Sequence, residues 1–317
     1  MGTMERDATR GRSRNRAAAG TSAGTAVAGT AGVAVGGADT DDAGLFGPDS
    51  VTWRVHREPI LWLGGLRSLY LQALHPRAIA GVMQNSTFRS DPWGRLARTA
   101  RYVGTVIFGT TAQAQLAGRR VRAVHARLTA IDPRTGERFR IDEPDLLRWV
   151  HVTEVESFLS TATRAGLRLS PAEADRYYAE QRRAAELVGL DPDSVPGSVA
   201  EVEEYYRQVR PQLAMTKEAA DVALFLAAPP LPWGLGLTPA RPALAGLAAT
   251  AVSLLPAWAR RLYGLPGLPT TDVAATLTAR TLRLALSALP SRLLQGPLYR
   301  DAMRRAARAA SAPAAAR

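Results

Sequence analysis

The chain has 317 residues, enough for one large domain or two small ones, and 46% of them are hydrophobic. Cysteine is absent, which excludes disulfide bonds, thiolate metal ligands and a cysteine nucleophile. The formal charge of +12 comes from arginines scattered among carboxylates, without the interleaved aromatic side chains of a nucleic-acid binder, so we expect no nucleic-acid partner.

The N-terminal segment differs in composition from the rest of the chain. Residues 1–47 are rich in Gly, Ala, Thr and Ser and poor in large apolar side chains, so burial cannot offset the entropy of ordering. We therefore expect a disordered arm over 1–47, one helical domain over 48–310 and a flexible tail over 311–317. Residues 17–38 lack the leucine-rich core of a secretory signal, which favours a cytoplasmic protein.

No segment has the ~20 apolar residues that a membrane-spanning helix needs. The stretch Pro242–Trp258 is apolar but short and rich in Ala. We expect it to form a buried helix, with interfacial contact, and so peripheral membrane association, as the minor alternative.

Helical periodicity dominates from Pro59 onward, and strand patterns are minimal, so the predicted fold class is all-α. The first helix has an apolar stripe at Leu63, Leu66, Tyr70 and Leu74, and Pro76 restarts the chain after it. A short hairpin is expected over 131–141, and Pro256 is expected to kink the helix that contains it. The later predicted helices span 93–108, 110–128, 143–164, 170–188, 198–210, 216–228, 242–263, 270–288 and 295–309.

The four histidines of the chain are candidates for chemistry, although His56 is expected to be a surface or packing residue. His75 precedes Pro76 at a helix boundary, which suits a fixed structural position. On the 110–128 helix we expect a buried stripe of Ala117, Val121, Val124 and Leu128. His125 lies one turn from Val121 and Leu128, so its ring should face the protein, either as a satisfied core histidine or as a ligand.

His151 and Glu154 are three residues apart on one predicted helix, so the carboxylate can reach the imidazole. A di-iron centre would need this pair twice, with further carboxylates. No Glu occurs between Glu58 and Glu137, and His125 has no carboxylate one turn away. A mononuclear His151/Glu154 metal site therefore remains as an alternative.

Arg95, Arg98 and Thr99 project from one face of the 93–108 helix, with apolar residues beside them. One interpretation is a solvated arginine edge. The other is a polar cluster aimed into an apolar pocket, where fixed donors hold an anion or polarise bound oxygen. A serine-hydrolase string at Gly20–Gly24 has no strand before it and no helix after it, and we attribute it to chance.

Four segments in the same order resemble the MpaB-type oxygenase family, which is related to the latex-clearing rubber oxygenases. The resemblance extends over roughly residues 50–265 and implies an all-helical, globin-like domain that holds a b-type haem. The rubber-cleaving relatives are oxygenases that cleave carbon–carbon double bonds in isoprenoid chains. The four segments are residues 73–82, 88–99, 124–127 and 147–155.

The resemblance also implies roles for individual residues. Arg95, Arg98 and Thr99 match the arginine, basic residue and threonine on the distal side of the haem, with Arg98 in place of a lysine. His125 is the best-placed counterpart of the histidine that ligates the iron, and His75 or His151 would ligate it or orient its surroundings. The family's upstream carboxylate is missing, and Asp91 is the only acid nearby.

Three functions follow from these interpretations. The first is a haem b-dependent oxygenase that uses dioxygen on a small hydrophobic substrate. The second is a non-enzymatic helical protein that binds a lipid or another apolar ligand. The third is a non-haem metal oxygenase centred on His151 and Glu154.

Overall fold

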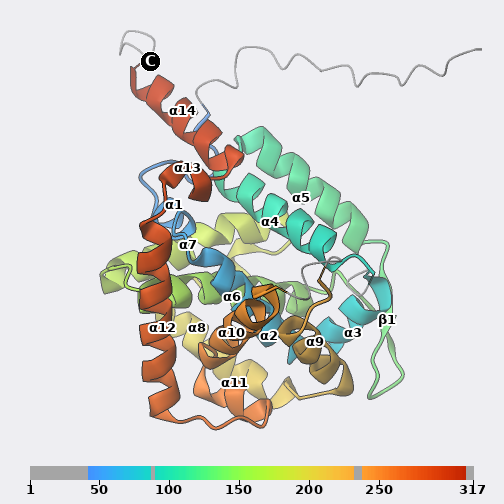
Figure 1. The fold of residues 1–317 in the computed structure, drawn as a ribbon. Coiled ribbons are helices and arrows are strands. Elements are labelled where there is room, and N and C mark those ends of the chain that lie inside the picture. The colour runs from blue at the N-terminus through green and yellow to red at the C-terminus, as the bar shows by residue number, and fades with distance from the viewer. Residues whose placement is uncertain (1–41, 87–89, 232–237, 312–317) are drawn as a thin grey trace, which may run out of the picture. The chain divides into compact units, whose positions relative to one another are not determined.

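The structure, a computed structural model, describes residues 42–86, 90–231 and 238–311 (Figure 1). These ranges are helical apart from turns, two 3₁₀ segments and one antiparallel hairpin, which confirms the all-α prediction. The early helices and the hairpin are α1 Val51–His56, α2 Leu61–Ala73, α3 Pro76–Asn85, α4 Pro92–Phe108, α5 Thr111–His125, β1 Thr129–Ile131, β2 Arg138–Arg140, α6 Pro144–Arg164 and α7 Pro171–Leu187. The later elements are η1 Pro192–Ser194, α8 Val199–Val209, η2 Arg210–Gln212, α9 Lys217–Ala227, α10 Ala240–Ser253, α11 Ala257–Leu262, α12 Pro269–Ser287, α13 Ser291–Leu294 and α14 Pro297–Ser311.

The segment that begins the described chain contacts the helical domain. The carboxylate of Asp42 accepts hydrogen bonds from the backbone N–H and the hydroxyl of Thr111, at 2.6 and 2.9 Å. Leu45 and Phe46 pack against a hydrophobic cluster that includes Trp53. Most of the expected disordered arm, residues 1–41, and the end of the expected tail, 312–317, lie outside the described residues.

Helices α2 and α6 pack against each other at the centre of the main core. The predicted stripe of α2 points inward, because Leu63, Tyr70 and Leu74 are buried and Leu66 is partly buried. A Cβ atom at Gly64 would lie 3.0 Å from the Ser157 carbonyl oxygen, so glycine permits this close approach.

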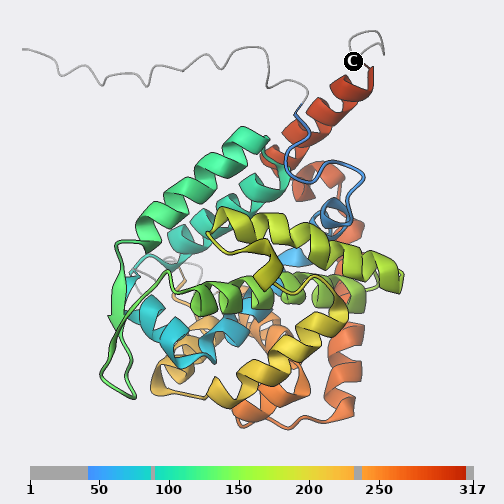
Figure 2. The ribbon, with the colours of Figure 1, turned by 180° about the vertical axis from the view of Figure 1, so that it is seen from behind.

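Helices α4 and α5 form an antiparallel hairpin with only two residues between them (Figures 1 and 2). Asp91 caps α4 by accepting from the Gly94 N–H at 3.0 Å, and Thr110 and Gln113 form a reciprocal capping box at the start of α5. The chain reversal brings the beginning of α4 to the same end of the hairpin as His125, the last residue of α5. The polar cluster at the beginning of α4 and His125 at the end of α5 therefore lie on neighbouring helices.

Three local predictions were wrong in detail. The predicted 242–263 helix is two helices, because Pro256 lacks the N–H that would continue the first helical ladder. Residues 51–56 form the short helix α1, which was not predicted from the sequence. The buried face of α5 is formed by Ala114 and Gly118, whereas Val124 of the predicted stripe is 55% exposed.

The buried guanidinium of Arg67 joins four parts of the fold. Its Nη atoms donate to both carboxylate oxygens of Glu156 at 2.6 and 3.0 Å, and Nη1 also donates to the Ser157 hydroxyl. Its Nε donates to the Leu254 carbonyl at the end of α10, at 2.9 Å. Tyr206 of α8 donates to the same Glu156 carboxylate at 3.1 Å. Because every strong donor here has an acceptor, the charges can stay buried.

Glu156→Gln should lower the free energy of unfolding by about 3 kcal/mol, because it leaves the buried Arg67 charge uncompensated. Urea denaturation measures the loss. The matched control is Asp142→Asn, which breaks the ion pair with Arg140 at the surface and should cost no more than about 1 kcal/mol. Equal losses in the two variants would contradict a special role for the Arg67 network.

Candidate functional site

The three candidate residues of α4 have different surroundings. Arg95 is partly buried, and burial together with the neighbouring Arg98 charge lowers its pKa. Among the described residues no carboxylate lies within ion-pair distance of Arg95, whereas the exposed Arg98 donates to Asp91 at 3.0 Å. Thr99 is exposed. Arg95 is thus the side chain of the three with a partly desolvated, unneutralised charge.

A tyrosine of α4 and a carboxyl group of α6 are close enough for the charge of one to act on the other. Burial and the charge of Glu154 together raise the pKa of Tyr102 to about 12. Burial also raises the pKa of Glu154 from 4.5 to about 7. Tyr102 lies seven residues after Arg95 and so shares its helix face, a spacing that could have identified it in the sequence. Glu154 is therefore an acid near neutrality on the α6 side of α4.

His125 is partly buried at the end of α5, and its Nδ1 is a buried nitrogen without a hydrogen-bond partner. Burial lowers its pKa, although the charge of Asp142 opposes this. The ring is therefore neutral at pH 7 and has an unsatisfied nitrogen. Among the described residues no hydrogen bond or ion pair joins His125 to Arg95, Arg98 or Thr99.

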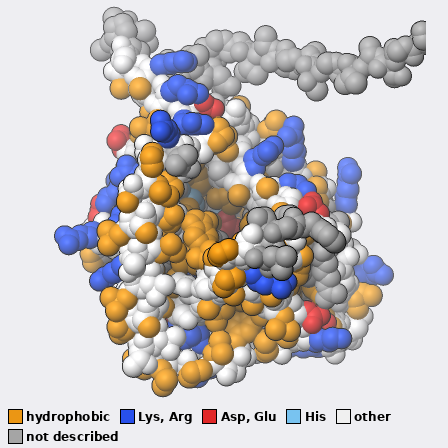
Figure 3. Space-filling view, in the orientation of Figure 1, with side chains coloured by type: hydrophobic (Ala, Val, Ile, Leu, Met, Phe, Trp, Pro, Cys, Tyr) orange, Lys and Arg blue, Asp and Glu red, His pale blue; other side chains and the backbone are white. Residues whose placement is uncertain are grey.

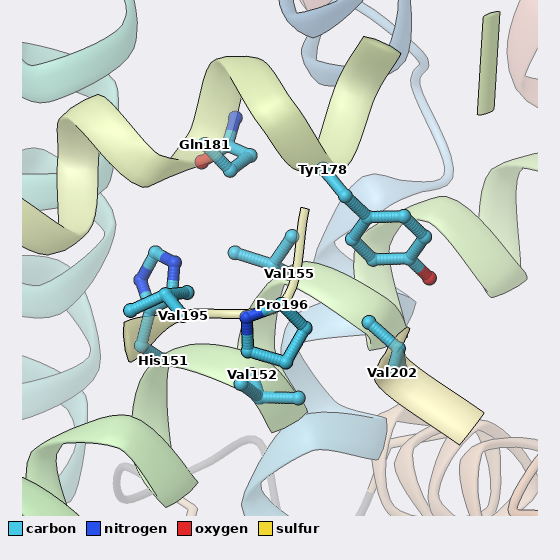
Figure 4. A pocket seen from close by; sticks show the side chains of 8 residues that line it. All are labelled: His151, Val152, Val155, Tyr178, Gln181, Val195, Pro196 and Val202. Atoms are coloured by element: carbon cyan, nitrogen blue, oxygen red, sulfur yellow. The ribbon is translucent and has the colours of Figure 1, made fainter. Parts of the chain in front are cut away.

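His151 points toward α7 and not toward a second metal ligand. It lines a cavity of about 10 Å³, room for one water at most, together with Tyr178, Gln181 and Val195 (Figure 4). Burial lowers its pKa to about 4, which keeps the imidazole neutral. Within the described parts of the chain no group of three or more His, Asp and Glu side chains could hold a metal ion.

His75 caps α3, and its Nδ1 accepts from the Ala78 N–H at 3.3 Å. Its ring lies 6.0 Å from the Trp149 ring and borders a separate cavity of about 410 Å³ that Arg148 and Tyr205 also line. Burial and the charge of Arg77 lower its pKa to about 4. The proline after His75 predicted a position at a helix boundary, and His75 is the N-cap residue of α3.

His56 is a packing residue, which was one of its two expected roles. It is buried against the rings of Phe158 and Tyr177, and its Nε2 lies 3.3 Å from the Tyr177 hydroxyl. Burial lowers its pKa to about 3. The four histidines thus occupy four different environments, and each imidazole is held toward its neutral form.

One face of the domain is hollowed between α4, α10 and α12, and hydrophobic side chains lie along part of the edge of the opening (Figure 3). The apolar side chains that flank the polar cluster of α4 are themselves partly open, with Trp93 41% and Leu96 50% exposed. The Trp93 indole N–H donates to the Pro230 carbonyl at 3.0 Å, which ties α4 to the segment after α9. An apolar molecule therefore has a surface to contact beside Arg95.

An all-α domain with neutral histidines and an unneutralised arginine beside an apolar hollow suits the binding of a cofactor and an apolar molecule. The chain matches the family model described as ER-bound oxygenase mpaB/B′/rubber oxygenase, catalytic domain, over residues 53–287. The chain belongs to that family, as its sequence motifs indicated. It is therefore an oxygenase-type protein, and membership of the family implies that it uses dioxygen and a small-molecule substrate.

No curated protein and no solved structure matches the chain. The matched range includes every candidate residue from His56 to Glu154. In the described ranges, none of the helices has the length and apolar character needed to cross a membrane.

Glu154→Gln should stabilise the protein at high pH. A folded-state pKa of about 7, above the ordinary 4.5, means that the native state holds this proton more tightly than the unfolded chain. Ionisation of Glu154 between pH 4.5 and pH 7 lowers the free energy of unfolding. The loss is absent below pH 4.5 and complete above pH 7. Urea titrations should show a gain of about 3 kcal/mol at pH 8 and no gain at pH 4. Glu137→Gln, at an exposed residue, is the control, and a gain independent of pH would contradict the assignment.

Proposed function

We propose that this chain is a haem b-dependent oxygenase that acts with dioxygen on an apolar substrate, and that His125 is the iron ligand. The observation that carries the proposal is the buried, unpartnered Nδ1 of His125 in a chain of the oxygenase family. A buried polar atom without a partner costs about 1–3 kcal/mol, and a bound ligand would remove that cost. A neutral imidazole is also the form that ligates iron.

Arg95 suits the anionic edge of such a cofactor. A haem carries propionate carboxylates, and Arg95 has a partly desolvated charge with no carboxylate partner among the described residues. Arg98 pairs with Asp91 and is less available. Arg95 would thus bind a carboxylate or donate hydrogen bonds to bound oxygen.

The number of protein ligands favours haem over a non-haem centre. One histidine would be enough to hold a haem, because the porphyrin itself binds the iron. A mononuclear non-haem site at His151 and Glu154 needs a third side chain, and the described residues provide no such cluster. His151 and His75 are then residues that position their helices.

The chain's own residues supply proton handling and exclusion of water. A haem, when bound, would activate dioxygen, which no side chain in this sequence does alone. Glu154, with a pKa of about 7, can accept or return a proton near the α4 face, where the family's upstream carboxylate is missing. Thr99 offers a hydroxyl on the Arg95 side of α4. The apolar hollow would hold the substrate away from bulk water (Figure 3).

The purified protein should show a Soret band that His125→Ala abolishes. His151→Ala should keep the band, because His151 faces the small cavity next to α7. A UV–visible spectrum, with and without dithionite and carbon monoxide, makes the comparison. A colourless protein that stays colourless after haem reconstitution, or a band lost only in His151→Ala, would overturn the proposal.

Arg95→Ala should weaken haem retention by about tenfold or more, since a hydrogen-bonded charged group contributes about 1.5–3 kcal/mol. Haem transfer to an excess of an apo-globin measures retention. Arg101→Ala is the matched control, because it removes an exposed arginine from the same helix. Equal loss rates in the two variants would contradict a contact between Arg95 and the cofactor.

A second function, non-enzymatic binding of an apolar ligand, is favoured by the apolar lining of the hollow alone (Figure 3). It predicts lipid that copurifies with the protein, no Soret band, and binding that His125→Ala leaves unchanged. The same spectra separate the two functions.

A further inference from the structure

Helix α12 has an apolar stripe that no part of the described chain covers. Its inner side packs on the domain through Ala275 and Ala279, which are buried. Val273, Leu277 and Leu284 lie within one narrow sector of the opposite side and are 60%, 56% and 67% exposed. Three large apolar side chains aligned in water on one helix face indicate a contact surface.

The sequence from the stripe to the end of α14 is rich in arginine. Residues 273–311 contain seven arginines and one acid, Asp301. Arg292, Arg300 and Arg308 are exposed, and among the described residues no carboxylate lies within ion-pair distance of any of them. The segment is therefore strongly basic next to an apolar surface.

The arginines of α14 point outward for a geometric reason. Ala302 is buried on the inner side of the helix, which packs on α4, and Arg300, Arg304 and Arg308 recur every four residues on the outer side. In Figure 3 the basic side chains along α14 and the apolar side chains along α12 are visible on one face, beside the hollow.

We propose that the α12 stripe and the α14 arginines form a docking surface for an anionic phospholipid bilayer. Apolar side chains that enter the headgroup region beside arginines that contact lipid phosphates are the chemistry of interfacial membrane binding. The surface is on this chain whether or not a haem is bound.

The charge of the surface selects a bilayer over a second copy of the chain. A symmetric dimer would place this surface against itself, and the unneutralised arginines of the two copies would repel one another. An anionic bilayer neutralises them instead, because lipid phosphates and carboxylates attract each arginine near the surface.

Cosedimentation of the full chain with vesicles tests the proposal. One set of vesicles contains phosphatidylcholine alone, and the other contains phosphatidylcholine with phosphatidylserine. We expect binding to the anionic vesicles that weakens as salt rises, and at least about tenfold weaker binding to the neutral ones.

Two sets of variants separate the apolar and basic contributions. Leu277→Asp with Leu284→Asp should abolish binding, whereas Leu116→Asp with Val199→Asp, at exposed apolar residues of α5 and α8, should not. The replacement of Arg292, Arg300 and Arg308 by Gln should weaken binding by about tenfold or more, relative to the same replacement of the exposed arginines Arg119, Arg120 and Arg138.

Three outcomes would overturn the proposal. They are no sedimentation with either kind of vesicle, equal binding to both kinds at all salt concentrations, and a dimer in solution that Leu277→Asp with Leu284→Asp dissociates. Circular dichroism of each variant confirms that the fold is retained, which is expected because all the substituted side chains are exposed.

Discussion

Helices α2 and α6 pack closely against each other at the centre of the fold, with the guanidinium of Arg67 buried at their contact. A guanidinium out of water needs acceptors for its nitrogens, and Glu156, Ser157 and the Leu254 carbonyl supply one to each nitrogen from two different parts of the chain. The network fixes the rotation of α6 about its own axis. Because His151 and Glu154 lie on the same helix, that rotation also sets His151 toward α7 and Glu154 close to Tyr102 of α4.

Three polar groups of the candidate site are buried or partly buried without a partner among the described residues, whereas the buried charge of Arg67 is paired. Glu154 titrates near pH 7, His125 has an unpartnered Nδ1, and Arg95 is partly desolvated next to another arginine. Each of these groups costs stability in the protein alone, and each would be stabilised by a ligand with complementary atoms. These groups lie on α4, α5 and α6, inside the range that matches the oxygenase family, and they are the residues on which the proposed cofactor site rests.

Local chemistry explains which parts of the fold could be predicted. Proline at the first helical position marked the starts of α3, α4, α6 and α7, because its missing N–H has no partner there in any case. The buried face of α5 was misplaced because the pattern of large apolar residues pointed to Val124, whereas the close contact with α7 needs a small residue. A Cβ at Gly118 would lie 2.7 Å from the Leu187 carbonyl oxygen. The proximity of Tyr102 to Glu154 depends on how two helices pack, which no local pattern encodes.

If His125 binds the iron of a haem, a variant that replaces its ring by a cavity should lose the haem spectrum. His125→Gly removes the ring while leaving space for free imidazole in its place. We predict that the variant loses the Soret band and the iron–histidine vibration in resonance Raman spectra, and that added imidazole restores both. A His125→Gly protein that retains the spectrum of the unaltered protein without imidazole would contradict the account.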